Sequence, residues 1–180
     1  VGGTSSSRPL EELLRQTPSI ALNPSGRHWN PWGSVTWTMH ASPSTLVSHL
    51  GKHPAMTGHP DWRQRWMNCD AVAAEAIKTF CAEGLWEGSI AHHLVNALPK
   101  NTLLRVASSM PIRDVDSFCV DPGRAIRVSS NRGVNGIDGT VATTLGAAAV
   151  HSEAVALLTG DLSMLHDVGA LLTTPQSQQP

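Results

Sequence analysis

The stretch SSNRGVNGIDGT, residues 129–140, combines three glycines with one arginine and one aspartate. So few packing side chains predict a segment that acts through its backbone or its charges. Glycines at 133, 136 and 139 would let backbone N–H groups approach an anion closely, ahead of a helix whose N-terminus favours negative charge. A glycine-rich loop before a helix is equally often only a tight turn, so the spacing alone leaves both interpretations open.

Charged residues in two further segments suit the same chemistry. Arg113 lies in ASSMPIRD, Arg132 in the glycine run, and Asp161 directly after the apolar stretch AVALLT. Guanidinium groups bind carboxylates or phosphates through paired hydrogen bonds, and an aspartate carboxylate is a hard oxygen ligand suited to Mg²⁺. The alternatives are that each arginine forms a surface ion pair and that Asp161 caps the helix beginning near Ser163. The residues by themselves therefore predict an anion-binding α/β domain.

The elements that must position these residues are strands alternating with helices. The expected strands are TLLRVAS at 102–108, IRVSS at 126–130 and AVALLT at 154–159. Apolar stretches of this kind, joined through helices, indicate a parallel sheet covered on both faces. The loops ASSMPIRD, SSNRGVNGIDG and TGDLS should then lie together beyond the carboxyl ends of the strands, where such sheets bind ligands.

The predicted helices of this region are about 61–82, SIAHHLVNAL at 89–98, TVATTLGAAAV and LSMLHDVGALL. The stretch SMPIRDVD between the first two strands is interpreted as a loop. The inner face of the long first helix is predicted to carry its apolar side chains, which are Trp62, Trp66, Cys69, Val72, Ala73, Ala76 and Phe80.

Composition shifts divide the chain into four parts. Residues 1–51 are predicted to be the end of one domain, with a helix in PLEELLRQ, strands in SIALN and SVTWTMHA, and a helix in STLVSHL capped by Ser42. The Pro- and Gly-containing segment 52–60 is typical of a linker. Residues 61–172 form the parallel α/β domain, and 173–180 are a polar tail.

Charge and cysteine content exclude several classes of protein. A net charge of -1 with 15% charged residues offers no basic surface for nucleic acid or anionic membranes. Apolar stretches are shorter than the roughly 20 residues of a membrane helix. Three widely spaced cysteines argue against a disulfide scaffold and a zinc site, and favour a reducing, cytoplasmic compartment. The spacing of His49, His53 and His59 fits no helix face, so we interpret them as solvated.

The strings SSMPIRDVD, SNRGVNGIDGTVATTLGAA and TGDLSMLHDVGALL, in this order, resemble one enzyme family. It is the 2-succinyl-5-enolpyruvyl-6-hydroxy-3-cyclohexene-1-carboxylate synthase family, which depends on thiamine diphosphate in menaquinone and phylloquinone biosynthesis. The resemblance covers about residues 85 to 172, and weaker similarity extends over residues 1–51. It implies that 1–51 end a Rossmann-like central domain and that 61–172 begin the diphosphate-binding domain.

The resemblance implies two cofactors, thiamine diphosphate and Mg²⁺. Asp161, beside Gly160 in GDL, matches the aspartate that binds the Mg²⁺ bridging the diphosphate. Ile137 in GIDG matches the bulky apolar residue under the bent cofactor. Gly160, Asp161 and Ile137 are therefore the expected cofactor-binding residues, with Asp161 as the metal ligand.

The resemblance also implies the substrates, 2-oxoglutarate and isochorismate. Ser109 matches a residue near cofactor and substrate, and Arg113 and Arg132 match arginines that hold substrate carboxylates. Both substrates are dicarboxylic acids, which agrees with the anion-binding interpretation of the arginines. The implied activity is that of a transferase, which decarboxylates 2-oxoglutarate and adds the succinyl unit to isochorismate, in a protein expected to be a homo-oligomer when full-length.

The sequence departs from the family in ways that predict a fragment. The N-terminal domain with the glutamate that activates the cofactor is absent, and no Asn-Asn pair follows Asp161 to complete the metal site. Ser108 stands where many relatives have Asn. We therefore expect the chain alone to be inactive. The alternatives are another thiamine-diphosphate decarboxylase or carboligase, and a non-catalytic remnant that acts as an interaction module.

Overall fold

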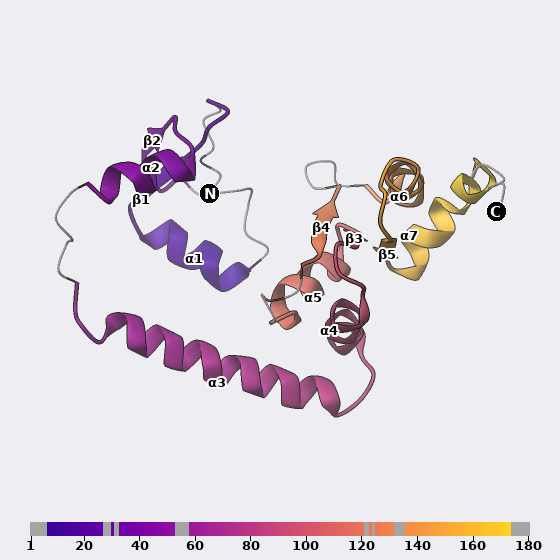
Figure 1. Ribbon diagram of the computed structural model, residues 1–180, viewed down its shortest axis with the longest axis horizontal. Helices are drawn as coiled ribbons and strands as arrows, with labels where there is room; N and C mark the ends of the chain where they lie inside the picture. The colour runs from indigo at the N-terminus through magenta and orange to yellow at the C-terminus, as the bar shows by residue number, and fades with distance from the viewer. Residues whose placement is uncertain are drawn as a thin grey trace. The chain divides into compact units, whose positions relative to one another are not determined.

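The computed structural model describes residues 7–26, 30, 33–52, 58–120, 123, 125–131 and 136–173 (Figure 1). The chain divides into two compact units, Val1–Cys69 and Asp70–Pro180, and the division falls within the long helix α3, Trp62–Ala82. Most of the expected linker, residues 53–57, lies outside the described residues, so the predicted four-part scheme stays a prediction. No helix in the described ranges is long and apolar enough to cross a membrane.

The first unit contains a two-stranded parallel sheet. Strand β1, Ser19–Leu22, pairs in parallel with β2, Val35–Met39. Helix α1, Arg8–Gln16, precedes the sheet, and helix α2, Pro43–Leu50, follows it. Ser42 caps α2, because its Oγ accepts the Thr45 N–H at 3.1 Å, as predicted.

The second unit is built on a three-stranded sheet with the strand order β4-β3-β5, in which β3 pairs in parallel with both neighbours. This confirms the α/β class with small open parallel sheets. Its elements after α3 are α4 (Glu87–Ala97), β3 (Leu103–Val106), α5 (Met110–Phe118), β4 (Arg127–Ser130), α6 (Thr140–Ala148), β5 (Val155–Leu158), α7 (Asp161–His166) and the 3₁₀ helix η1 (Val168–Thr173).

Helices cover both faces of this sheet. Successive side chains of a strand point to opposite faces, so Leu104 and Val106 of β3 share one face and Arg105 takes the other. Leu104 and Val106 form a buried cluster with Val95 of α4, and α5 packs against it. Helix α6 lies on the face of Arg105. Figure 1 shows α4 and α5 on one side of the strands and α6 on the other.

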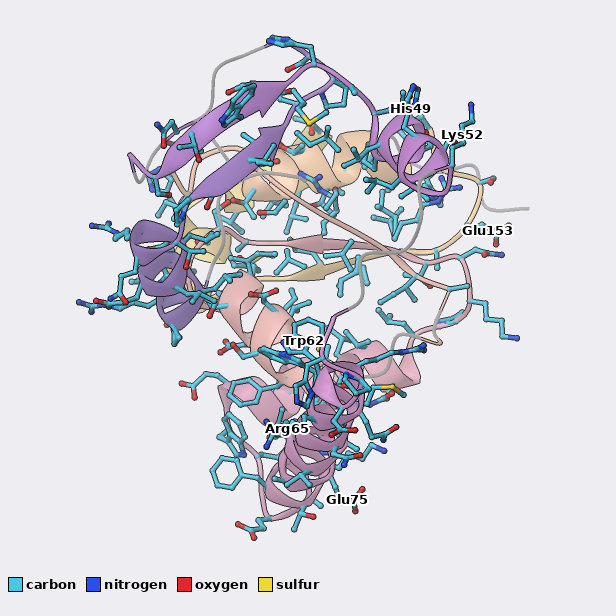
Figure 2. All side chains as sticks on the ribbon, turned by 90° about the vertical axis from the view of Figure 1, so that its left-hand side faces the viewer. His49, Lys52, Trp62, Arg65, Glu75 and Glu153 are labelled. Carbon is cyan, nitrogen blue, oxygen red and sulfur yellow. The ribbon has the colours of Figure 1, made fainter. Side chains whose placement is uncertain are left out.

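The predicted inner face of α3 is wrong. Trp62, Trp66, Val72 and Phe80 are 62%, 61%, 71% and 54% exposed. Figure 2 shows Trp62 and other labelled α3 side chains projecting from the helix. The physical reason is that the described helices and strands make few contacts with α3, and of these four residues Phe80 packs its ring against Trp86. Of the α3 residues, Cys81 alone is buried.

Two segments of the second unit also differ from the prediction. SMPIRDVD forms helix α5 instead of a loop, with Pro111 in its first turn, where a missing N–H costs nothing. Ile112 and Val115 of this helix pack on the core. They are three positions apart, so the helical conformation places both on one face, and their burial stabilises the helix. The last predicted helix breaks at Asp167, whose backbone leaves the helical conformation between α7 and η1.

Candidate functional site

The carboxyl ends of β3, β4 and β5 lie at one edge of the sheet. Val106 is opposite Ser130 of β4 and Leu158 of β5. Beyond the last paired residues, the Ala107 N–H donates to the Leu158 carbonyl at 2.9 Å, and the hydroxyls of Ser108 and Ser130 are 3.1 Å apart. The loops that follow the three strands therefore begin side by side, as the sequence predicts.

The connections that leave this edge separate to opposite faces of the sheet. After β3 the chain enters α5, which lies with α4. After β5 it enters α7, which contacts α6 on the other face. A point where neighbouring strands send their connections to opposite faces is the usual ligand-binding place of an open parallel sheet. The candidate site is therefore the edge formed by the ends of β3 and β5 and the loop after β4.

Asp161 is the first residue of α7, and the residue at its N-cap position is Gly160. The alternative in which Asp161 is itself the N-cap is thus wrong. The Asp161 Oδ1 accepts the neighbouring Leu162 N–H at 2.8 Å, and the side chain is exposed. A Cβ added to Gly160 would meet no atom within 4 Å, so packing does not demand glycine there.

A magnesium ion needs few protein ligands. Mg²⁺ usually keeps several waters and binds one or two carboxylates together with substrate phosphates. The exposed carboxylate of Asp161 suits that chemistry. Among the described residues no group of three His, Cys, Asp or Glu side chains converges on a metal position, so Asp161 as a metal ligand stays a prediction.

Arg113 is exposed on α5 and has no ion-pair partner in the described part of the chain. Its Nη1 lies 3.9 Å from the Met110 Sδ, which is a weak contact. The surface ion pair considered as an alternative is therefore not formed there. Ser109, at the N-cap position of α5, is exposed and makes no capping hydrogen bond through its side chain. Both side chains are accessible for a ligand.

The glycine run is described only in part. Arg132 and Gly133 lie outside the described residues, so the pairing of Arg132 with Arg113 stays a prediction. Ile137 is 38% exposed, which leaves an apolar surface at the loop. Gly139 has φ of 68°, a left-handed conformation that side chains disfavour, and helix α6 begins directly after it.

The N-terminus of α6 is occupied by a carboxylate of the chain itself. The Asp167 Oδ2 accepts the N–H groups of Val141 at 2.6 Å and of Ala142 at 2.9 Å. These two N–H groups are therefore engaged within the chain, and anion binding by the rest of the glycine run stays a prediction. Gly139 has no side chain to cap the helix, and Asp167 satisfies two of the free N–H groups instead.

The neighbouring residue makes a second contact with the same loop. The His166 Nε2 is hydrogen-bonded to the Asp138 Oδ1, on the other side of Gly139 from the Asp167 contacts. Sequence reasoning missed both His166 and Asp167. The one available signal was a helix start with glycine at the cap position, which shows that a cap is needed but not where it comes from.

A polar network connects β3 with the start of α6. Arg105 donates to the Ser129 Oγ and the Asn131 Oδ1. The Asn131 Nδ2 donates to the Thr143 Oγ1 at 3.2 Å, and that hydroxyl donates to the Gly139 carbonyl. The buried Arg105 Nε has no partner among the described residues. An arginine inside an apolar strand was the signal that could have identified this network.

The titratable groups with shifted pKa lie near α5. Burial, with a smaller effect of Glu87, raises the pKa of Asp114, which is 7% exposed. Burial, followed by Cys81 and Asp114, raises the pKa of Cys119 to about 11. The Cys119 thiol therefore stays protonated at neutral pH, and its Sγ contacts the Ala91 carbonyl at 3.5 Å. Reactive cysteines have a lowered pKa, so Cys119 lacks the thiolate character that such reactivity needs.

Comparison with known proteins gives one consistent result. No family model matches the chain. It is 34% identical over 175 residues to the 2-succinyl-5-enolpyruvyl-6-hydroxy-3-cyclohexene-1-carboxylate synthase of Bacillus cytotoxicus, which covers 95% of this chain and 30% of that enzyme. The synthase of the same name from Myxococcus xanthus is 43% identical over 122 residues, or 66% of this chain and 21% of the enzyme. That of Haloarcula marismortui is 30% identical over 173 residues, or 95% and 29%.

These matches run along most of the chain but only part of each relative. The chain spans about 30% of the length of the Bacillus and Haloarcula enzymes. The chain is homologous to the 2-succinyl-5-enolpyruvyl-6-hydroxy-3-cyclohexene-1-carboxylate synthases and belongs to their family, as a counterpart of a segment of these longer enzymes.

Proposed function

We propose that this chain forms part of a thiamine-diphosphate-dependent synthase that joins the succinyl unit of 2-oxoglutarate to isochorismate. The observation that supports it most directly is the placement of Arg113 and Asp161. They follow the adjacent strands β3 and β5 at one sheet edge, both are exposed, and neither forms an ion pair among the described residues. Charges left unpaired at a ligand-binding edge are available for a charged ligand.

In this proposal Asp161 would hold the Mg²⁺ that accompanies the cofactor, because its carboxylate is exposed at the start of α7. Gly160 leaves open space beside it, and Ile137 offers an apolar surface to the cofactor. Thiamine diphosphate, when bound, supplies the carbanion chemistry that decarboxylation of a 2-oxo acid requires. The residues of this chain would bind and orient the cofactor. The Asp161 carboxylate would hold the metal, and the apolar side chain of Ile137 would contact the ring system.

Arg113 holds a carboxylate of a dicarboxylic substrate, with Arg132 as its partner and Ser109 nearby. A guanidinium that forms no ion pair within the described residues can give both of its parallel N–H groups to a carboxylate. The activity belongs to the whole enzyme, which includes an activating glutamate in another segment and is expected to be a cytoplasmic homo-oligomer. Another thiamine-diphosphate carboligase and a non-catalytic remnant remain the alternative functions.

A chimera tests the proposal. The aligned segment of the Bacillus cytotoxicus synthase is replaced by this chain, and the consumption of 2-oxoglutarate and isochorismate is measured. Arg113→Ala should raise KM for a substrate roughly ten- to a hundredfold, because one leg of a charge-assisted pair is worth about 1.5–3 kcal/mol. Its affinity for magnesium–thiamine diphosphate should survive. Asp161→Ala should lose that affinity.

Two exposed residues of α3 provide matched controls, Arg63→Ala for the arginine and Asp70→Ala for the aspartate. Neither should change the kinetics. A folded chimera that binds the cofactor but responds equally to Arg113→Ala and Arg63→Ala would refute the substrate role. A folded chimera without cofactor affinity would refute the proposed function. Calorimetry of the 180-residue chain alone should show only weak binding, because its described residues supply one identifiable metal ligand.

A further inference from the structure

We propose that His166 and Asp167 form a clamp that fixes the loop 136–139 relative to helix α7, and so acts as a positioning device for the cofactor site. The consequence for the cofactor rests on the proposed function. The structural half of the proposal is independent of that function. It concerns two consecutive residues, His166 and Asp167, that contact the chain on both sides of Gly139.

The first half of the clamp is the cap that Asp167 gives to α6. The helix starts after Gly139, which makes no capping bond of its own. Thr140 and Val141 are 8% and 3% exposed, so water has little access to the Val141 N–H, whereas Ala142 is exposed. A buried N–H without a partner is costly, and Asp167 supplies that partner from 25 and 26 residues away.

The second half is the contact between His166 and Asp138. Asp138 precedes Gly139, and the residues capped by Asp167 follow it. Adjacent residues at the end of α7 thus hold both sides of a left-handed turn. The break between α7 and η1 fits this role, because Asp167 adopts φ of -113° and leaves the helix at the residue whose carboxylate reaches α6.

The clamp joins the segments proposed to touch the cofactor. Ile137 directly precedes Asp138, and Asp161 begins the six-residue helix that ends at His166. A short helix transmits position rigidly from one end to the other. Through the clamp, a displacement of α7 would move Ile137, and a displacement of the loop would move Asp161. Neither His166 nor Asp167 need touch the cofactor, so we call them positioning residues.

Amide hydrogen exchange of the 180-residue chain tests the structural half. In Asp167→Ala the amides of Val141 and Ala142 should exchange roughly two- to thirtyfold faster, the range expected for loss of an N-cap. Asp167→Asn keeps an acceptor oxygen and should restore most of the protection. Asp70→Ala, an exposed aspartate on α3, should leave these amides unchanged. Unchanged protection of both amides in Asp167→Ala would overturn the clamp.

A second set of variants guards against a failure of Asp167→Ala to fold. Asp138 and His166 are exposed, with side-chain fractions of 83% and 51%, so their removal leaves the core intact. Asp138→Ala and His166→Ala should each accelerate exchange in residues 136–139, and the double variant should add little to either. Additive effects of the two substitutions would show that the residues act independently and would contradict the proposal.

The cofactor half is tested in the chimera by titration with magnesium–thiamine diphosphate. Asp167→Ala should weaken affinity about tenfold or more in protein shown to be folded, and Asp167→Asn should recover most of it. A cap that serves stability alone would lower the unfolding midpoint and leave the affinity of the folded protein unchanged, which would overturn the positioning role. If the unsubstituted chimera binds no cofactor while the exchange results are as expected, the proposed function fails and the clamp itself is supported.

Discussion

The two faces of the β4-β3-β5 sheet use the same strand in different ways. On the face of α4 and α5, Leu104 and Val106 of β3 are buried in an apolar cluster. On the face of α6, Arg105 of the same strand donates hydrogen bonds to Ser129 and Asn131. On the first face apolar side chains are shielded from water. On the second face hydrogen bonds hold the side chains of Arg105, Ser129 and Asn131 in fixed directions.

The difference shows which face of the sheet stabilises the fold and which face positions the loop after β4. Hydrophobic burial is non-directional and roughly proportional to area, so it contributes most of the free energy of folding. Hydrogen bonds contribute less net free energy but constrain geometry. We therefore expect substitutions on the α4/α5 face to lower global stability, and those on the α6 face to disturb the loop after β4 at a smaller cost in stability.

The largest effect should follow Leu104→Ala. Leu104 is 0% exposed, and its truncation leaves a cavity in the cluster. Substitutions of this type lower the free energy of unfolding by about 2–5 kcal/mol. Urea unfolding followed by circular dichroism measures the change. Leu85→Ala, at a position 85% exposed, is the control and should stay within about 0.5 kcal/mol of the original chain. Similar losses for both variants would remove the distinction between core and surface.

Gly88→Ala should also act on the apolar face. A Cβ at Gly88 would lie 2.1 Å from a Trp86 ring atom and 2.5 Å from a Phe118 ring atom. Relief of such a clash requires a shift of packed rings, and overpacking typically costs about 1–3 kcal/mol. The thermal midpoint should fall relative to Gly84→Ala, where an added Cβ meets nothing within 4 Å. An equal midpoint for the two variants would show that the rings move freely.

Arg105→Lys tests the polar face. Lysine keeps the charge but lacks the planar fork that reaches Ser129 and Asn131 at once. We expect a loss of about 1 kcal/mol in stability, the usual size of one hydrogen bond, together with a clear change in the Asn131 side-chain amide resonances. Arg127→Lys, at an exposed position of β4, should change neither. Unaltered Asn131 resonances in Arg105→Lys would refute the positioning role of this face.

The smallest effect concerns Asp114 and depends on pH. Burial raises its pKa above the ordinary value of 3.8, so the unfolded chain gives up this proton more readily than the folded chain. Stability from this group therefore falls as pH rises from below 3.8 through the raised pKa. Asp114→Asn should be slightly more stable than the original chain at neutral pH, and this advantage should vanish in acid. Unfolding midpoints across that range measure it, with Asp70→Asn as the control, and a constant difference at all pH values would contradict the assignment.

Local patterns predicted much of the second unit. Apolar stretches identified all three strands of its sheet, and their parallel arrangement follows from the helices between them. The carboxyl edge as the meeting point of the loops also follows from that arrangement. Arg113 and Asp161 could be named as candidates because residue type and position after a strand are visible in the sequence. Their roles stay predictions.

What the sequence by itself determined is the class of fold, the strand edge and the family, because these depend on periodicity and on motifs within short windows. Only the tertiary structure decided which partner each polar group finds. Asp167 reaches the start of α6 from 25 and 26 residues away, and Arg105 joins Ser129 and Asn131 from 24 and 26 residues away. A helix that needs a cap accepts any suitable carboxylate that folding brings to it. That choice depends on how the elements pack, which no local pattern specifies.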